Sequence, residues 1–282
     1  MIDLPIDIIH NLNKLGYDLI SSVYLSGGDI NEARRLKTHN GKDYFLKYNL
    51  GTEAELILSS EIGGLKLLRG NDLQSANPVV DGSTYSIPYL LLEWIETSIR
   101  KDLRLAELIV KMHRVTNAQY GLETDNYIGS LPQKNTWSSS FSEFYLSCRI
   151  EPQIKLARDN GFVVSGSLER FQGVIESEIP SEKPSLIHGD LWSGNLMDGP
   201  QGPVLVDPSV SYAHREMDLA MMSLFGGFSR GVFLEYENLF PLIGDWRQRS
   251  DLFQLYYLLV HLNLFGESYL SQVQSIFSRY LH

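Results

Sequence analysis

Two segments in the second half of the chain carry carboxylate and amide side chains at spacings suited to phosphoryl transfer. The first is HGDLWSGN, residues 188–195, and the second is VLVDP, residues 204–208. Phosphoryl transfer needs a carboxylate that orients the acceptor hydroxyl, and oxygen ligands that hold Mg²⁺ against the phosphates. Asp190 can supply the first, and Asn195 with Asp207 can supply the second. Asp and Asn near turns often only cap backbone groups, but this ordered set between two apolar runs favours catalysis.

A second group of candidates lies in the N-terminal third. The stretch SGGDINEA joins two strand candidates, and its Gly27 and Gly28 would let backbone N–H groups approach a phosphate. Lys47, on the following strand, can pair with the α- and β-phosphates of ATP while Glu61, on the next helix, holds it. An ordinary hairpin turn, a solvated lysine and an exposed helix carboxylate are the plain alternatives. The order of these residues, taken with 188–207, favours nucleotide binding.

The apolar run YSIPYLLLEWI ends where the composition changes. Its last residues, Glu93, Trp94 and Ile95, can present backbone donors and acceptors to adenine at the point where strand becomes linker. An ordinary buried strand end fits the same composition, and both interpretations stay open.

The elements that must position these residues change in kind along the chain. Strand patterns over 19–49 surround an Asn-Gly turn, a helix pattern follows Gly51 to Gly70, and strand patterns return over 78–95. Helix patterns then dominate, at 102–114, 137–160 and 166–179. We therefore predict an α+β, bilobal fold with an antiparallel sheet and a helix in the first lobe. The predicted parts are an N-terminal lobe over 1–92, a hinge over 93–97 and a mostly helical lobe over 98–282.

Composition narrows the choice of partners. The 282 residues include 34 acidic and 24 basic side chains, giving a net charge of -10, so nucleic acid is repelled and a small cationic substrate is attracted. Cys148 is the single cysteine, so no internal disulfide can form, which favours a reducing compartment. No segment approaches the roughly 20 apolar residues of a membrane span. We expect a cytoplasmic protein with no membrane partner.

Several strings, taken in order, resemble the fructosamine (ketosamine) kinase family, within the protein-kinase-like small-molecule phosphotransferases. They are SGGDINEA, LLLEWIE, DNYIGSLPQKNTWSSSFSEFY, HGDLWSGN, DPSVSYAHREMDLAMMSLFGGF and HLNLFG. The resemblance covers nearly the whole chain. It implies a bilobal kinase-like fold and phosphorylation, with ATP and Mg²⁺, of the sugar 3-hydroxyl of ketosamines. Repair of glycated amines, on free sugar amines or on glycated protein, would follow from that activity.

The resemblance also carries roles to individual residues. It supports Asp190 as base, Asn195 and Asp207 as metal ligands, Lys47 with Glu61 on phosphate, and 93–95 as the nucleotide hinge. Trp192 and His261 become substrate candidates, Trp192 through an apolar wall or a cation–π contact with the substrate ammonium. Core packing is the alternative for both. Three further residues are expected to brace the catalytic loop, namely His188, His214 and Asp218.

Two other functions remain open on the sequence. The same catalytic set would serve an aminoglycoside or choline kinase, since it fixes the reaction and leaves the acceptor open. The second alternative is a catalytically silent nucleotide-binding protein, although the sequence retains the candidate base and metal ligands. One departure concerns the glycine-rich loop, where many eukaryotic relatives have cysteine and this chain has Asp29. A redox switch in that loop is therefore not expected. Asp29 also places a negative charge near the expected phosphates, which disfavours a direct phosphate contact from the loop.

Overall fold

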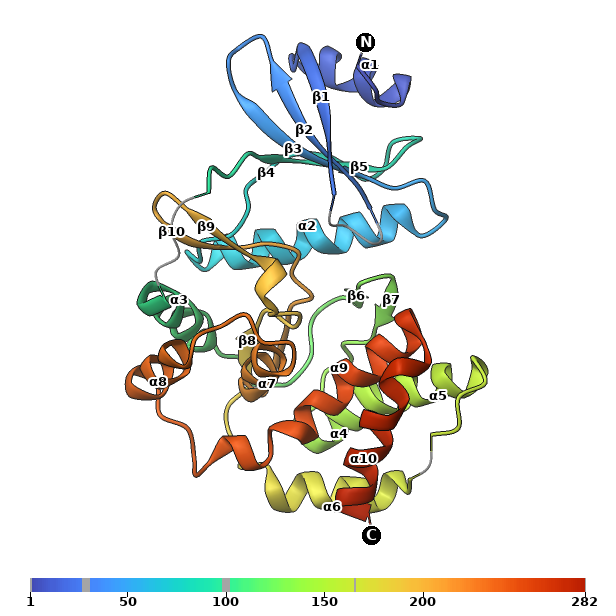
Figure 1. The fold of residues 1–282 in the computed structure, drawn as a ribbon, viewed down its shortest axis with the longest axis vertical. Coiled ribbons are helices and arrows are strands. Elements are labelled where there is room, and N and C mark those ends of the chain that lie inside the picture. The colour runs from blue at the N-terminus through green and yellow to red at the C-terminus, as the bar shows by residue number, and fades with distance from the viewer. Residues whose placement is uncertain (1, 27–30, 98–101, 165, 282) are drawn as a thin grey trace. The chain divides into compact units, whose positions relative to one another are not determined.

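The protein consists of two compact units (Figure 1). The computed structural model describes residues 2–26, 31–97, 102–164 and 166–281, and it describes only the backbone at 102, 103 and 281. Unit 1 contains residues 1–100 and 197–207, and unit 2 contains 101–196 and 208–282. The mixture of an N-terminal antiparallel sheet with a helical remainder confirms the predicted α+β class.

Unit 1 is built on a five-stranded antiparallel sheet with the strand order β1-β2-β3-β5-β4. The predicted Asn-Gly turn joins β2 to β3, and Gly41 there has a φ of +80°. In the described part of the chain, the unit also contains the helices α1 and α2 and the β9–β10 hairpin. Their bounds are α1 Ile6–Lys14, β1 Leu19–Leu25, β2 Glu32–Thr38, β3 Asp43–Tyr48, α2 Ala54–Gly70, β4 Pro78–Gly82, β5 Tyr89–Glu93, β9 Leu196–Gly199 and β10 Gly202–Leu205.

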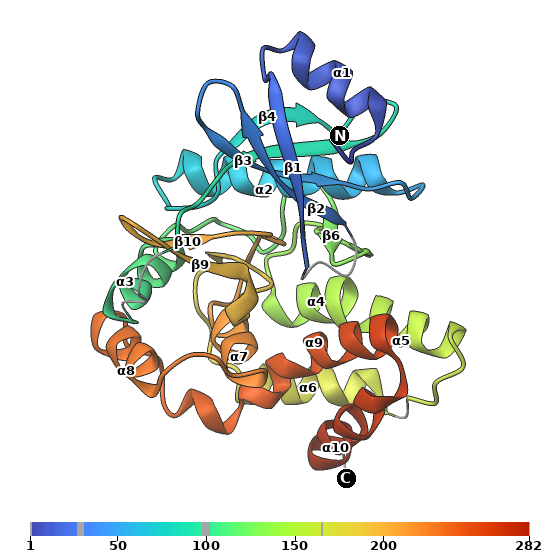
Figure 2. The same ribbon diagram turned by 45° about the horizontal axis from the view of Figure 1, so that its top comes forward.

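The two helices of unit 1 cover opposite faces of the sheet (Figures 1 and 2). Alternation along β3 produces this arrangement, because successive side chains of a strand point to opposite faces. Leu46 packs in the cluster that contains Ile8 and Leu12 of α1. Phe45 packs in the cluster of Leu58, which belongs to α2. Lys47, two residues beyond Phe45, therefore points to the α2 face.

Unit 2 is mostly helical, and α9 forms its centre. The sequence of α9 is apolar on nearly all sides, as expected for a helix that other helices surround. Figure 2 shows α9 among α4, α5, α6 and α10. The helices are α3 Asp102–His113, α4 Phe141–Tyr145, the π-helix η1 Leu146–Ile150, α5 Glu151–Asp159, α6 Leu168–Glu178, α7 Glu216–Leu224, α8 Arg230–Leu239, α9 Ser250–Phe265 and α10 Leu270–Leu281.

Short elements complete unit 2 and position its polar loops. Two pairs of strands, β6 with β7 and β8 with β11, are antiparallel. Their bounds are β6 Asn126–Ile128, β7 Leu131–Gln133, β8 Ser185–Ile187 and β11 Ser211–Ala213, and the 3-10 turns are η2 Ser193–Asn195, η3 Trp246–Gln248 and η4 Glu267–Tyr269. Among the described residues, no helix is both long and apolar enough to cross a membrane.

The chain leaves unit 2 after Leu196 and returns to it at Pro208. The intervening β9–β10 hairpin belongs to unit 1, where Leu205 exchanges backbone hydrogen bonds with the segment 74–76. The predicted lobe boundaries place this hairpin in the second lobe, since they divide the chain only once. The boundaries at 92 and 97 themselves stay a prediction.

Candidate active site

In unit 1, Lys47 forms ion pairs with two carboxylates. Its Nζ lies 3.1 Å from Oε1 of Glu61 on α2 and also contacts Oδ1 of Asp207. The Lys47 and Glu61 side chains are both only 9% exposed, whereas that of Asp207 is 42% exposed. The structure thus brings together three of the sequence-predicted residues, on β3, on α2 and just after β10.

The charges in this group depend on one another. Burial alone would lower the pKa of Lys47, but the attraction of the Asp207 and Glu61 carboxylates raises it well above the ordinary value, so the ammonium keeps its proton. Burial raises the pKa of Glu61, and the neighbouring Lys47 opposes that rise. Asp207 has a φ of +53°, a conformation uncommon outside glycine, and it ends the β9–β10 excursion.

In unit 2, the loop 188–195 holds Asp190 and Asn195 in direct contact. Nδ2 of Asn195 donates to Oδ2 of Asp190 and to its backbone carbonyl, both at 2.9 Å. This arrangement directs the Asn195 amide nitrogen to Asp190 and leaves its amide oxygen, Oδ1, as an additional acceptor. The five-residue spacing seen in the sequence is what allows this contact within one turn of loop.

Two backbone features fix the path of the loop before Asp190. Gly189 has a φ of +82°, and a Cβ there would lie 2.1 Å from the carbonyl oxygen of Ser209. The N–H of Ser209 donates to the carbonyl of His188 at 2.9 Å, which holds the two segments together. Only glycine fits such a left-handed and crowded position.

Asp218, on α7, binds the loop from the other side. Its Oδ2 accepts from the N–H of His188 at 2.8 Å, and its Oδ1 accepts from the N–H of Gly189 at 2.9 Å. The Asp218 side chain is fully buried, as is that of His113, whose Nε2 lies 3.1 Å from Asp218 Oδ2. Sequence reasoning singled out Asp218 but missed His113, which lies in the ordinary helical stretch LIVKMHR.

The other two predicted supports make different contacts. Nδ1 of His188 accepts from the N–H of Asp190 at 3.3 Å, within the loop itself. Nδ1 of His214 accepts from the N–H of Glu216, and Nε2 lies 3.1 Å from the Pro180 carbonyl. Since an Nε2–H can donate to that carbonyl, these bonds connect His214 to the start of α7 and not to the catalytic loop.

The predicted hinge residues follow the end of β5 in unit 1. Glu93 is the last residue of β5, and its N–H donates to the Asn77 carbonyl at 3.0 Å. The ring of Trp94 lies under the guanidinium of Arg35, 4.1 Å from the centroid to Cζ. Ile95 packs against the α2 cluster. Gly27 and Gly28, the predicted phosphate-loop residues, lie outside the described residues.

The two substrate candidates are both aromatic and lie in unit 2. Trp192 is 41% exposed, and its ring lies over Gly194, where a Cβ would meet Cη2 at 2.1 Å. His261 is half-buried, and its Nδ1 donates to the Tyr257 carbonyl at 2.7 Å. Its ring contacts that of Phe225 at 4.5 Å between centroids. Burial lowers the pKa of His261, which favours the neutral ring.

Asp207 in unit 1 and Asn195 in unit 2 each carry an oxygen atom of a kind that suits Mg²⁺. A carboxylate and a side-chain amide oxygen are hard ligands, and Mg²⁺ is commonly held by one or two carboxylates together with substrate phosphates. Asp207 and Asn195 are such groups, and each stands next to a point where the chain passes between the units. Within the described part of the chain, no group of three His, Cys, Asp or Glu side chains is arranged to hold a metal.

The fold is that of the kinase-like small-molecule phosphotransferases. The chain is similar over 96% of its length, and 96% of the other chain, to a choline kinase from Streptococcus pneumoniae, with a TM-score of 0.61 at 16% identity. It is more similar to the crystal structure of a protein assigned as a fructosamine-3-kinase from Haemophilus somnus 129PT. That match has a TM-score of 0.87 at 26% identity and covers 98% of this chain and 97% of the other.

Sequence comparison narrows the class to one family. The family model described as fructosamine kinase matches residues 3–282, so the chain belongs to that family and is a phosphotransferase. A probable ketoamine kinase from Enterococcus faecium is 41% identical, covering 90% of this chain and 93% of its own. A protein-ribulosamine 3-kinase of Arabidopsis thaliana is 34% identical, covering 91% and 81%. The predicted family and kinase-like fold are thereby confirmed.

Proposed function

We propose that this kinase transfers the γ-phosphoryl group of ATP, with Mg²⁺, to the sugar 3-hydroxyl of a ketosamine. The observation that carries the proposal is the conformation of loop 188–195, in which Asn195 holds the Asp190 carboxylate while Asp218 holds the two preceding amides. Phosphoryl transfer depends on positioning and charge neutralisation, and a loop fixed from both sides is suited to both.

Each residue has a separate task in this mechanism. Asp190 orients the acceptor hydroxyl and accepts its proton as the oxygen attacks phosphorus. Asn195 and Asp207 would hold Mg²⁺, which neutralises charge on the phosphates when it is bound. Lys47 would bind the α- and β-phosphates, with Glu61 keeping its ammonium in place.

The nucleotide base and the acceptor are assigned to different units. The backbone of Glu93 to Ile95 would bind adenine, and Gly27 with Gly28 would approach the phosphates. Trp192 and His261 are proposed to contact the acceptor. A protonated amine next to the sugar would be attracted by the exposed Trp192 ring through a cation–π contact worth about 0.5–2 kcal/mol.

The acceptor class rests on the relatives. Their names, ketoamine kinase and protein-ribulosamine 3-kinase, point to sugars linked to amines. We extend this to free amine-bearing sugars and to glycated protein amines, so that the reaction would begin the removal of glycation. The net charge of -10 favours such cationic acceptors over polyanions.

Direct assay tests the proposal. Purified protein is incubated with Mg-ATP and one acceptor at a time: a ribulosamine, a fructosamine, an aminoglycoside or choline. The mass of each acceptor is then measured by mass spectrometry. A gain of one phosphate on a ketosamine is expected. If only the aminoglycoside or choline gains phosphate, the protein is still a kinase, but the proposed ketosamine acceptor is wrong. No transfer to any of them would count against the proposal and favour a silent nucleotide-binding protein.

Two variants separate the chemical step from nucleotide binding. Asp190→Ala removes the base, so kcat should fall by about 10²- to 10⁴-fold while ATP still binds. Lys47→Ala removes a phosphate contact, so the KM for ATP should rise by about tenfold or more, which corresponds to about 1.4 kcal/mol. Steady-state kinetics and nucleotide titration measure both effects. Near-normal turnover of Asp190→Ala would refute this mechanism.

A further inference from the structure

The carboxylate of Asp218 is the inner end of a buried line of hydrogen bonds that extends away from the catalytic loop. His113, at the end of α3, lies between Asp218 and the hydroxyl of Tyr236 on α8. Its Nε2 is 3.1 Å from Asp218 Oδ2, and its Nδ1 is 2.8 Å from the Tyr236 oxygen. The His113 and Asp218 side chains have no exposed surface, so water cannot replace either bond.

The partners of His113 determine which ring nitrogen carries the proton. Burial raises the pKa of the Tyr236 hydroxyl above its ordinary value, so this group keeps its proton and can donate to Nδ1. Nη1 of Arg215 lies 3.4 Å from the Tyr236 oxygen and donates to it, which turns the hydroxyl proton towards the His113 ring. Nε2–H then remains to donate to the Asp218 carboxylate.

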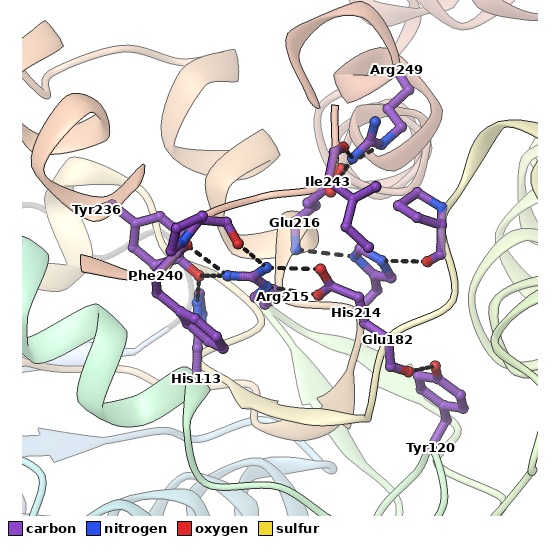
Figure 3. Close-up of polar contacts among 12 residues, drawn as sticks. His113, Tyr120, Glu182, His214, Arg215, Glu216, Tyr236, Phe240, Ile243 and Arg249 are labelled. Carbon is purple, nitrogen blue, oxygen red and sulfur yellow. Dashed lines mark hydrogen bonds and ion pairs between the residues drawn. The ribbon is translucent and has the colours of Figure 1, made fainter. Parts of the chain in front are cut away.

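The outer end of this line is itself fixed (Figure 3). Arg215 forms two 2.7 Å hydrogen bonds with the Glu182 carboxylate, and it donates to the carbonyls of Phe240 and Pro241 at 2.9 and 2.7 Å. Its guanidinium also lies 3.9 Å from the centroid of the Phe240 ring. The Arg215 guanidinium cannot turn without breaking several of these hydrogen bonds, so it is a rigid support for the Tyr236 hydroxyl.

We propose that His113 is a positioning residue for phosphoryl transfer, which acts by holding Asp218 in the orientation that fixes the backbone before Asp190. Asp218 accepts from His113 and from the N–H groups of His188 and Gly189. Those two residues directly precede Asp190. The inference rests on the proposed function for its catalytic consequence, but the effect on the loop is independent of it.

A buried carboxylate that loses one of its donors is free to rotate, and its other bonds then weaken. In unit 2 such a rotation would release the amides of His188 and Gly189 together, since each binds a different oxygen of Asp218. The consequence belongs to the chemical step more than to ground-state binding, because Asp190 acts on the proton of the reacting hydroxyl.

Two substitutions at His113 distinguish the role of each ring nitrogen. The amide nitrogen of glutamine reaches about as far as Nε2 of histidine, so His113→Gln keeps a donor to Asp218. The amide of asparagine reaches only as far as Nδ1, so His113→Asn keeps a partner for Tyr236 and loses the donor to Asp218. Both variants keep a polar, uncharged group in a similar volume.

His113→Asn should lower kcat about ten- to a hundredfold with little change in the KM for ATP or acceptor, as expected for loss of an outer partner of a functional group. His113→Gln should stay within a few-fold of the wild-type kcat. Amide hydrogen exchange of a peptide spanning 186–192 should be faster in His113→Asn than in His113→Gln, because the N–H groups of 188 and 189 lose protection.

Tyr145→Phe is the matched control, since it removes a buried hydroxyl that donates to the Leu252 carbonyl at 2.7 Å elsewhere in unit 2. It should lower stability and leave both kcat and the 186–192 exchange unchanged. Equal kcat and equal exchange in the asparagine and glutamine variants would overturn the inference. If the wild type transfers no phosphate, the proposed function fails, and the exchange measurement alone decides the role of His113.

Discussion

His214 shows how one buried side chain can make the protein sensitive to acid. Burial lowers the pKa of its imidazole, although Glu216 and Glu182 act to raise it and Arg215 adds to the lowering. The ring is fully buried and lies against Phe141. A histidine whose pKa is lower in the folded protein than in the unfolded chain binds fewer protons when folded, and stability then depends on pH.

The sign of this dependence follows from the direction of the shift. Above the unfolded pKa of about 6.5 the ring is neutral in both states, and as pH falls below it only the unfolded chain gains the proton. The free energy of unfolding should therefore fall on acidification from about pH 7.5 to about pH 5.5. In His214→Gln this loss should be smaller. Urea unfolding at the two pH values measures both proteins.

His39→Gln serves as the control for this experiment, since His39 is exposed in the turn between β2 and β3. This variant should keep the full pH dependence of the wild type. An unchanged dependence in His214→Gln would mean that other groups account for the acid sensitivity.

For individual residues, the sequence predicted a pair of neighbours where the two residues lie on consecutive elements, a strand and the helix that follows it. Lys47 and Glu61 come together at 3.1 Å because alternation along β3 and the following helix place them on facing surfaces. His113 had no such signal, since its partners Asp218 and Tyr236 are 105 and 123 residues away. They become neighbours in the fold, because α3 packs against α8 and its last residue, His113, contacts Asp218 on α7.

At the scale of elements, the catalytic loop depends on Gly189. Gly189→Ala should lower kcat by at least about tenfold and stability by about 1–3 kcal/mol, because the new Cβ meets the Ser209 carbonyl and the φ of +82° is strained. Loop 188–195 would have to move to relieve that contact. Steady-state kinetics and urea unfolding measure the two effects.

Gly161→Ala separates the backbone strain from the collision. Gly161 follows α5 with a φ of +88°, and no atom lies within 4 Å of the position of its Cβ. The free energy of unfolding of Gly161→Ala should fall by about 1–2 kcal/mol, because alanine is strained in the left-handed backbone conformation. Its kcat should equal that of the wild type. Equal kcat in the Gly189 and Gly161 variants would show that the Ser209 contact does not position the loop.

The predicted helix over 137–160 shows where periodicity reaches its limit. The structure contains α4, the π-helix η1 and α5 in succession across this range. Arg149, in η1, is buried and donates to the side chains of Asn135 and Ser211, at 2.8 and 3.1 Å. A π-helix changes the direction of side chains relative to a regular α-helix, so the Arg149 guanidinium can face loops that are distant in the sequence. Apolar spacing carries no signal for such a change.

At the scale of the whole molecule, the class of fold was predictable and the path of the chain between units was not. The change from strand to helix patterns indicated two lobes. The β9–β10 hairpin joins unit 1 through the backbone of Gln74 and Ala76, far away in the sequence. Hydrogen bonds of this kind depend on backbone groups that every residue has, so side-chain patterns do not predict them.

The net charge of -10 is a property of the whole molecule, and it predicts how salt concentration changes the KM for a cationic acceptor. A ketosamine with a protonated amine is attracted by a negative protein, and salt screens that attraction as the Debye length falls from about 30 Å at 0.01 M to about 8 Å at 0.15 M. At saturating Mg-ATP, the KM for such an acceptor should rise by at least about twofold over this range. Initial rates at a series of acceptor concentrations measure it.

An acceptor whose amine has been acylated provides the comparison, because it keeps the sugar and loses the positive charge. Its KM should change much less with salt, since long-range attraction acts only on the charged form. If both acceptors respond equally, salt acts on the enzyme or on the nucleotide, and the negative charge of the protein has no part in attracting the amine. A difference confined to the cationic acceptor would connect the composition of the whole chain to its choice of substrate.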